Sequence, residues 1–311
     1  MSFILLSHWN GRFGNRMHQY AYGATYSKLH NVDFILTSDW EGTYLFQNQQ
    51  HKVSEDDEIR LYLNQTNAEF HTEDMQKYII TKYYPTAQRI HPESDSAYLE
   101  HMHPVYFDSV CAYSKHVFAK QTKQHLLDIF ELSDAVKETD AYKYWSDRKG
   151  TYDIAHLRRD DISNASYNKT NPQGYSVISK ESYIKAFEKF GFNPEEVEWT
   201  SDDHTGKWHA DRKPTPSFGW TYPAGSTYKS PEVFDWLEDF LRLYFARTIF
   251  RANSSFSWWA SFLSPTATVY SPVLDKQLIY GRDGKEEEIE IEFVKGNYPH
   301  WMYGVPDIRI K

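Results

Sequence analysis

The alternation of apolar and polar positions predicts a βαβ unit at the start of the chain. Phe3–Leu6 is a short apolar run with the length of a buried strand, and Val32–Leu36 is a second one. Between them, apolar and small residues recur every three or four positions over residues 17–29, which is the spacing of one helix face. Gly11 and Gly14 lie in the turn before this helix. Strand, turn, helix and strand in this order indicate a parallel sheet.

A second unit led by a strand follows in the other half of the chain. Its predicted elements are the strand Tyr152–Leu157, the helix Glu181–Phe190, the strand Val197–Thr200, the amphipathic helix Pro231–Arg247 and the strand Thr248–Arg251. Ahead of the second helix, residues 213–231 are rich in proline, glycine and aromatic side chains. A stretch of that length without regular structure is typical of a lid or an insertion.

Chain length and a change in composition predict two domains. With 311 residues, the chain exceeds the size of one comfortable hydrophobic core. The segment Tyr144–Gly150 has the composition of a linker. We therefore expect an N-terminal α/β domain of residues 1–148, a second α/β domain of residues 149–275, and a tail of residues 276–311 that packs back on the N-terminal domain.

Composition and charge narrow the functional classes. The formal net charge of −9 argues against a nucleic-acid partner, because phosphates require a basic surface. Cys111 is the only cysteine, so an intrachain disulfide is excluded and a reducing compartment is favoured. The apolar run at the N-terminus is too short for a signal peptide or a transmembrane anchor. We expect a cytoplasmic protein, of a viral or bacterial kind. Aromatic residues make up 17% of the chain, which suits sugar rings but equally suits core packing.

The first candidate motif runs from Gly11 to Tyr20, directly after the first strand. Its two glycines, Gly11 and Gly14, let the backbone turn sharply at the carboxyl end of that strand. In an open α/β sheet this is where ligands bind. The third glycine of a dinucleotide-binding fingerprint is missing, and a plain strand-to-helix turn is the alternative.

The second and third motifs point to an anion site. Arg158 and Arg159 directly follow a predicted strand, and arginine forms bidentate bonds with phosphate oxygens. The alternative is that both pair with Asp160 and Asp161 in a surface network. The segment Asn253–Ala260 reads Asn-Ser-Ser-Phe-Ser-Trp-Trp-Ala, whose hydroxyls and helix-opening N–H groups could bind an anion. Here the alternative is an N-cap followed by a core aromatic cluster.

Taken together, these stretches resemble the α-1,2-fucosyltransferase family and its relatives, the protein O-fucosyltransferases. The family pattern runs Gly-Arg-Leu/Phe-Gly-Asn-Gln-Met, His-Ile/Val-Arg-Arg-Gly-Asp, Ser-Asp-Asp and Asn-Ser-Ser-Phe-Ser-Trp-Trp-Ala. The chain carries counterparts of all four stretches in the same order, the third within Thr200–Asp203. Asp239 stands fourteen residues before Asn253, as in the family, and Pro299-His300-Trp301 matches a C-terminal Pro-x-Trp.

The resemblance implies a GT-B-type glycosyltransferase, in which two Rossmann-like domains face a cleft. The enzyme would move fucose from GDP-fucose to a glycan hydroxyl, with inversion and without a metal or other cofactor. The sequence indeed holds no Asp-x-Asp, the spacing by which many glycosyltransferases bind a divalent cation. The N-terminal domain would bind the acceptor and residues 149–275 the donor.

The same resemblance assigns candidate residues to the site. Arg158 would neutralise the departing GDP, and Asn15 would lie near the donor phosphates and the reacting hydroxyl. His18 is the candidate general base, with a structural or surface role as its alternative. His156 and Asp239 would bind guanine, although a solvated position on the helix face is the alternative for Asp239. The proposed donor-binding residues are Arg12, Gly14, His156, Arg159, Asp203, Asp239, Ser254, Ser255 and Phe256.

Three positions depart from the family pattern and keep other functions open. Arg16 replaces a glutamine, His18 an apolar residue and Asp160 a glycine. One alternative is the same fold acting on another GDP-sugar or on a UDP-sugar. The other is a catalytically inactive relative that only binds glycans.

Overall fold

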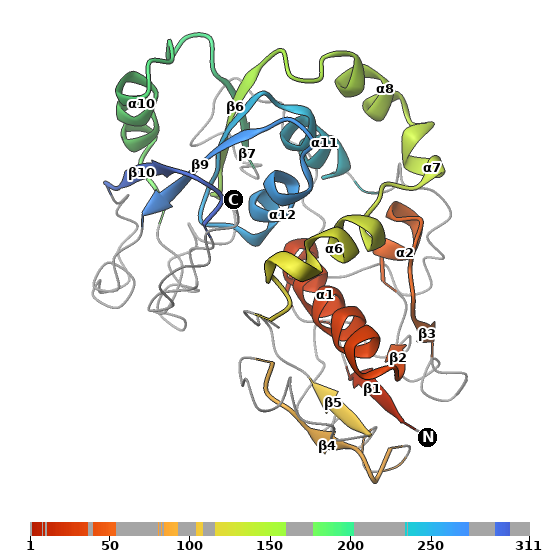
Figure 1. The fold of residues 1–311 in the computed structure, drawn as a ribbon. Coiled ribbons are helices and arrows are strands. Elements are labelled where there is room, and N and C mark those ends of the chain that lie inside the picture. Colours follow the sequence, from red (N-terminus) through yellow and green to blue (C-terminus); the bar gives the residue numbers. More distant parts are fainter. Residues whose placement is uncertain are drawn as a thin grey trace. The chain divides into compact units, whose positions relative to one another are not determined.

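The structure is a computed structural model of the chain. It describes residues 2–7, 9, 11–36, 40–53, 80, 82, 84–92, 104–107, 116–159, 177–201, 234, 236–273 and 290–298. The described residues up to Lys137 belong to one compact unit, and those from Glu138 onward belong to a second. Figure 1 shows the described elements of both units.

The first unit contains a parallel five-stranded sheet. Its strands are β1 (Phe3–Leu6), β2 (Asp33–Leu36), β3 (Lys52–Val53), β4 (Gln88–Arg89) and β5 (Val105–Phe107). They lie in the order β3-β2-β1-β5-β4, so β1 is central. The chain adds strands first on one side of β1 and then on the other. The boundary between β1 and β5 is therefore a topological switch point, the place where α/β sheets bind ligands.

Helix α1 (Phe13–His30) packs against β1 and β2 (Figure 1). It starts earlier than the periodicity from residue 17 predicts, because the turn residues around Gly14 already have helical backbone. Apart from Asn15, which is partly exposed, the residues from Phe13 to Tyr26 are buried on all sides of the helix, which explains why its amphipathic pattern is weak. The helix ends at Asn31, whose φ of 51° lies in the left-handed region.

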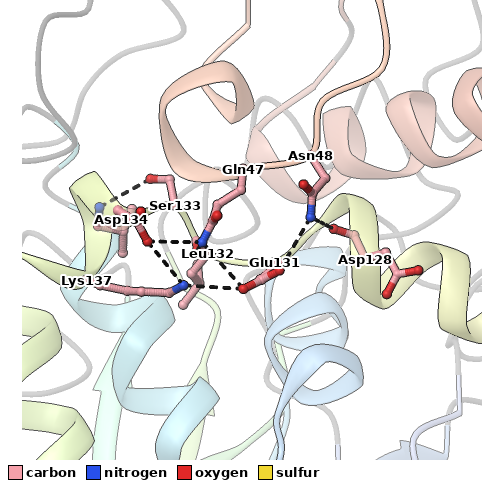
Figure 2. Close-up of polar contacts among 9 residues, drawn as sticks. Gln47, Asn48, Asp128, Glu131, Leu132, Ser133, Asp134 and Lys137 are labelled. Atoms are coloured by element: carbon pink, nitrogen blue, oxygen red, sulfur yellow. Dashed lines mark hydrogen bonds and ion pairs between the residues drawn. The ribbon is translucent and has the colours of Figure 1, made fainter.

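Side-chain hydrogen bonds connect the segment after α2 (Gly42–Leu45) to the turn between α6 (Lys123–Ile129) and α7 (Asp134–Lys137). Figure 2 shows Gln47 Nε2 donating to the Leu132 carbonyl at 2.9 Å and to Asp134 Oδ1 at 3.2 Å. Lys137 forms ion pairs with Glu131 and Asp134 in the same network. These exposed ion pairs add little stability, about 0–1 kcal/mol each, but the backbone contacts fix the position of the segment.

The second unit contains a mainly parallel five-stranded sheet. Its strands are β6 (Asp153–Leu157), β7 (Glu198–Ser201), β8 (Thr248–Phe250), β9 (Thr268–Val273) and β10 (Glu292–Lys295), in the order β10-β9-β8-β6-β7. Only β10 runs antiparallel to its neighbour. The described helices of this unit are α8 (Asp140–Asp147), α10 (Lys180–Lys189), α11 (Leu237–Phe245) and α12 (Ser255–Leu263). Here the switch point lies between β6 and β8.

Aromatic side chains fill the core of the second unit. The Phe250 ring stacks on Tyr270 with a centroid distance of 4.7 Å, and Phe187 meets Phe250 edge-on at 4.6 Å. Tyr183 and Phe293 lie 4.8 Å apart in the same cluster. Much of the aromatic excess thus serves core packing, as the alternative interpretation of the composition holds.

Three details of the predicted organisation are wrong. The expected linker at 144–150 is partly the end of helix α8, which packs on α11 through Trp145, a residue only 5% exposed. The helix expected from Pro231 begins at Leu237, because neither Phe234 nor Trp236 is helical. The described part of the tail, residues 290–298, belongs to the second unit, whereas the prediction assigned it to the first.

Strand β10 of the tail pairs with β9 of the second unit. Beyond it, Ser271 Oγ donates to the Gly296 carbonyl at 2.6 Å, and the buried Arg251 donates to the Tyr298 carbonyl. The tail is thereby part of the second unit up to residue 298. Residues 299–311, including Pro299 and Trp301, lie outside the described residues.

Candidate functional site

Two loops meet at the carboxyl edge of the second sheet, at its switch point. The loop after β6 begins with Arg158 and Arg159, and the loop after β8 leads through Asn253 and Ser254 into α12. Because β6 and β8 are parallel neighbours, their carboxyl ends lie at the same edge. The arginine motif and the serine motif, which lie about a hundred residues apart in the sequence, are therefore brought to the same edge of the sheet.

A hydrogen bond joins the two loops. Arg158 Nη1 donates to the backbone carbonyl of Asn253 at 3.2 Å. Ser254 is the N-cap of α12, and its Oγ accepts the Phe256 N–H at 3.2 Å. The Arg158 guanidinium thus lies beside the positive end of a helix dipole, and the two effects together favour a bound anion. The N-cap interpretation of this motif is confirmed, and the partly exposed Ser255 and Phe256 remain at the same edge.

Arg159 has a different environment from its neighbour. It is 1% exposed, and its Nη1 donates to the Arg158 carbonyl at 3.2 Å. Arg159 is therefore a buried side chain, and its pairing with Asp160 and Asp161 stays a prediction. Its burial favours bracing of the Arg158 backbone over direct contact with a donor. Asp160 and Asp161 lie outside the described residues.

His156 and Asp239 lie near each other through β7. His156 pairs in register with Thr200, and the Thr200 hydroxyl donates to Asp239 Oδ1 at 2.5 Å. The Asp239 side chain is only 16% exposed, with Arg242 Nη1 at 3.9 Å, so its position is not the solvated helix face of the alternative interpretation. The His156 carbonyl accepts the Tyr183 hydroxyl at 2.8 Å, which fixes the strand end.

Phe256 is the centre of an aromatic group at this edge. Its ring lies 5.9 Å from the His156 ring, 6.0 Å from Trp236 and 5.6 Å from Phe240. The sequence analysis did not single out Trp236, which is partly exposed. The one sign of Trp236 in the sequence is its position three residues before Asp239, at the start of the same helix.

In the first unit, the glycine motif lies at the carboxyl edge of the sheet, after the end of β1. Gly11 has a φ of +69°, and a Cβ there would lie 2.3 Å from Asn15 Nδ2, so glycine is required for Asn15 to approach the loop. The Asn15 N–H donates to the Arg12 carbonyl at 2.9 Å in the first turn of α1. Arg12 and Asn15 are partly exposed, whereas Gly14 is buried.

Arg16, one of the departures from the family pattern, braces this loop from inside. Its Nε donates to the Gly11 carbonyl at 3.0 Å, and its Nη1 lies 3.2 Å from Glu41 Oε2. Both side chains are buried. Burial raises the pKa of the Glu41 carboxyl, and the positive charge of Arg16 opposes that rise. The substitution thus comes with a matching acidic partner.

His18 lies in the core of the first unit. It is 1% exposed, and its ring meets Phe118 edge-on at a centroid distance of 5.5 Å. Burial lowers the pKa of His18 to about 3, so the imidazole is neutral at physiological pH. A general base must reach the hydroxyl that it deprotonates, and this burial favours the structural interpretation over the catalytic one.

The whole chain is similar to solved structures. The fucosyltransferase NodZ from Bradyrhizobium matches with a TM-score of 0.50 and 12% sequence identity, over 95% of this chain and 99% of that chain. The chain has an α/β fold of the GT-B type. Arabidopsis thaliana FUT1 matches with a TM-score of 0.46 and 10% identity, over 89% of this chain and 72% of that one. No protein-family profile matches the sequence, and no curated protein does. At this identity the likeness shows the GT-B fold alone.

Several predictions lie outside the described residues of the GT-B fold. Asp203 is among them, as is the 213–231 stretch. Within the described part, no group of three or more His, Cys, Asp or Glu side chains could hold a metal ion, and metal independence stays a prediction. No described helix is both long and apolar enough to cross a membrane.

Proposed function

We propose that this protein transfers fucose from GDP-fucose to a hydroxyl group of a glycan acceptor. The observation that carries the proposal is the Arg158 guanidinium, held by the Asn253 carbonyl beside the capped N-terminus of α12. A guanidinium and a helix N-terminus at a topological switch point suit a phosphate group, which supports the proposal. The order of the four sequence motifs and the GT-B fold support the choice of donor. NodZ is itself described as an α-1,6-fucosyltransferase, in a crystal soaked with GDP-fucose.

In this proposal the second unit binds the donor. Arg158 and the opening of α12, with Ser254, Ser255 and Phe256, bind the diphosphate. Asp239 accepts the guanine N1–H and exocyclic amine, and His156 lies along the same edge. Arg159 supports the backbone of Arg158 from the core.

The first unit binds the acceptor. At the end of its β1, Arg12 and Gly14 serve the donor, and Asn15 lies near the donor phosphates and the reacting hydroxyl. The acceptor oxygen attacks the anomeric carbon, and the bond from that carbon to the GDP oxygen breaks with inversion. The electron pair leaves on GDP, where Arg158 balances the growing negative charge without a metal. The hydroxyl proton passes to a base that is not assigned among the described residues.

Nucleotide binding tests the proposal before any acceptor is known. We expect GDP-fucose and GDP to raise the melting temperature in the presence of EDTA, because a ligand that binds only the folded state stabilises it by mass action, about 2.7 kcal/mol at 100 times Kd. UDP and UDP-sugars should produce no comparable shift. Stabilisation by UDP-sugars alone would show another donor, and stabilisation by none would favour an inactive relative.

Replacing Asp239 with asparagine should weaken GDP binding selectively. The amide oxygen can still accept the Thr200 hydroxyl, but the paired contact with guanine N1–H and amine is lost. Loss of such a charged acceptor raises the Kd for GDP by about 10–100-fold. Isothermal titration with GDP measures the change. Glu238→Gln is the matched control, since the exposed Glu238 on the same helix contacts Trp145 instead. An unchanged Kd in the Asp239 variant would remove the guanine assignment.

A further inference from the structure

Three aromatic rings form a continuous stack in the first unit. The Trp9 ring stacks on Trp40 with a centroid distance of 5.2 Å and an interplanar angle of 18°. Trp40 in turn stacks on Tyr20 at 4.5 Å and 16°. Trp40 is 1% exposed and Tyr20 is fully buried, whereas Trp9 is partly exposed.

The buried part of the stack is held rigidly. The Tyr20 hydroxyl accepts the Gln50 N–H at 2.8 Å and lies 3.1 Å from His51 Nδ1. A Cβ at Gly42 would lie 2.1 Å from the Trp40 ring, so the chain passes Trp40 at a distance that only glycine permits. Trp9 therefore rests on a base that cannot shift without disturbing the core.

The position of Trp9 distinguishes it from the aromatic residues of the core. It lies between the end of β1 and Gly11, and its partner Trp40 follows β2, so it stands after the carboxyl ends of two neighbouring parallel strands. Arg12 and Asn15, both partly exposed, follow within the next six residues. A preorganised aromatic face beside hydrogen-bonding groups suits a ligand with one apolar face and a polar rim.

We propose that Trp9 is the stacking platform for a pyranose ring of the glycan acceptor in the first unit. The C–H groups on one face of a pyranose pack on the indole, and the ring hydroxyls reach Asn15. The rigid Trp40–Tyr20 base lowers the ordering cost of binding. The inference rests on the proposed function for the identity of the ligand as an acceptor.

Sugar binding can be measured without turnover. Saturation-transfer NMR on the full chain with GDP present, using lactose, N,N′-diacetylchitobiose and cellobiose as probes, should show transfer to at least one disaccharide. Trp9→Ala should raise the Kd of that probe about tenfold, and Trp9→Phe, which keeps a smaller ring, by less. Tyr144→Ala is the control, since Tyr144 is 57% exposed and belongs to the second unit. The melting temperature of every variant and its shift by GDP report on folding and on the donor site.

The outcomes separate the two proposals. A Kd that Trp9→Ala raises about tenfold and Tyr144→Ala leaves unchanged supports the platform. An unchanged Kd in Trp9→Ala, or no transfer to any probe in the natural protein, overturns it. If Trp9→Ala fails to fold, a Kd for Trp9→Phe equal to that of the natural protein overturns it instead. If sugar binding depends on Trp9 but GDP does not shift the melting temperature, the Trp9 platform is supported and the fucosyltransferase proposal is contradicted.

Discussion

Arg158→Ala is expected to lower kcat for fucosyl transfer by about 10²–10³-fold, equivalent to roughly 3–4 kcal/mol of transition-state stabilisation. Negative charge grows on GDP as the bond to fucose breaks, so the guanidinium acts more strongly in the transition state than in the bound donor. KM should therefore change less than kcat. Steady-state kinetics with GDP-fucose and an acceptor measure both. Arg158→Lys should recover part of the rate, since an ammonium supplies the charge without the bidentate fork.

Arg247→Ala is the matched control for this prediction. Arg247 pairs with Asp153 at 2.6 Å, at the amino end of β6, whereas Arg158 follows the carboxyl end of the same strand. The guanidinium of Arg247 is largely exposed, and its loss should leave kcat unchanged. Equal loss of rate in both variants would indicate a general effect on the fold. An unchanged kcat in Arg158→Ala would remove the arginine from the mechanism.

The sequence predicted those elements whose pattern is local. Strands β1, β2, β6 and β8 contain apolar runs next to turn residues, β7 directly follows Val197, and apolar or small residues recur every three or four positions in helix α1, so each was found. Strands β4 and β5 are two and three residues long and exist through pairing within the sheet, which no local pattern records. The end of α8 was missed for a similar reason.

Trp145 in α8 sits against two arginines, Arg148 at 4.9 Å and Arg242 at 5.0 Å from its ring centroid. Both arginines pair with Glu198 on β7. A segment that is polar in sequence is thereby packed through cation–π contacts and ion pairs. From composition alone, such a polar segment is predicted to be a linker.

The candidate site shows the same division. Arg158, Ser254 and Asp239 lie at the carboxyl edge where their motifs place them, because the edge follows from strand order. The burial of Arg159 and His18 depends on the packing of distant residues, and the motif gives no sign of it. Trp9 and Trp40 were missed because their stacking joins two loops that only the parallel sheet brings together.

His18→Phe should remove a pH dependence of stability while leaving transfer activity at pH 7 intact. The folded pKa is lowered to about 3 by burial, whereas the unfolded chain takes up a proton near its ordinary value of 6.5. Above pH 6.5 the His18 imidazole is neutral in both the folded and the unfolded state, so it does not lower the free energy of unfolding. As the pH falls below 6.5 the unfolded state gains the proton first, so stability is lost down to about pH 3. Each pH unit well inside this window costs up to about 1.4 kcal/mol, or roughly 2 kcal/mol by pH 5.

Urea unfolding at pH 7, 6 and 5 measures this difference between the natural protein and the variant. Other groups titrate in both proteins, so the free energy of unfolding should fall less steeply in His18→Phe by about 2 kcal/mol between pH 7 and pH 5. His30→Phe is the control, because His30 lies at the partly exposed end of the same helix. If His18→Phe keeps its fold but loses transfer at pH 7, His18 is the general base after all. Its burial would then have to open during turnover, since an imidazole packed on Phe118 cannot reach a sugar hydroxyl.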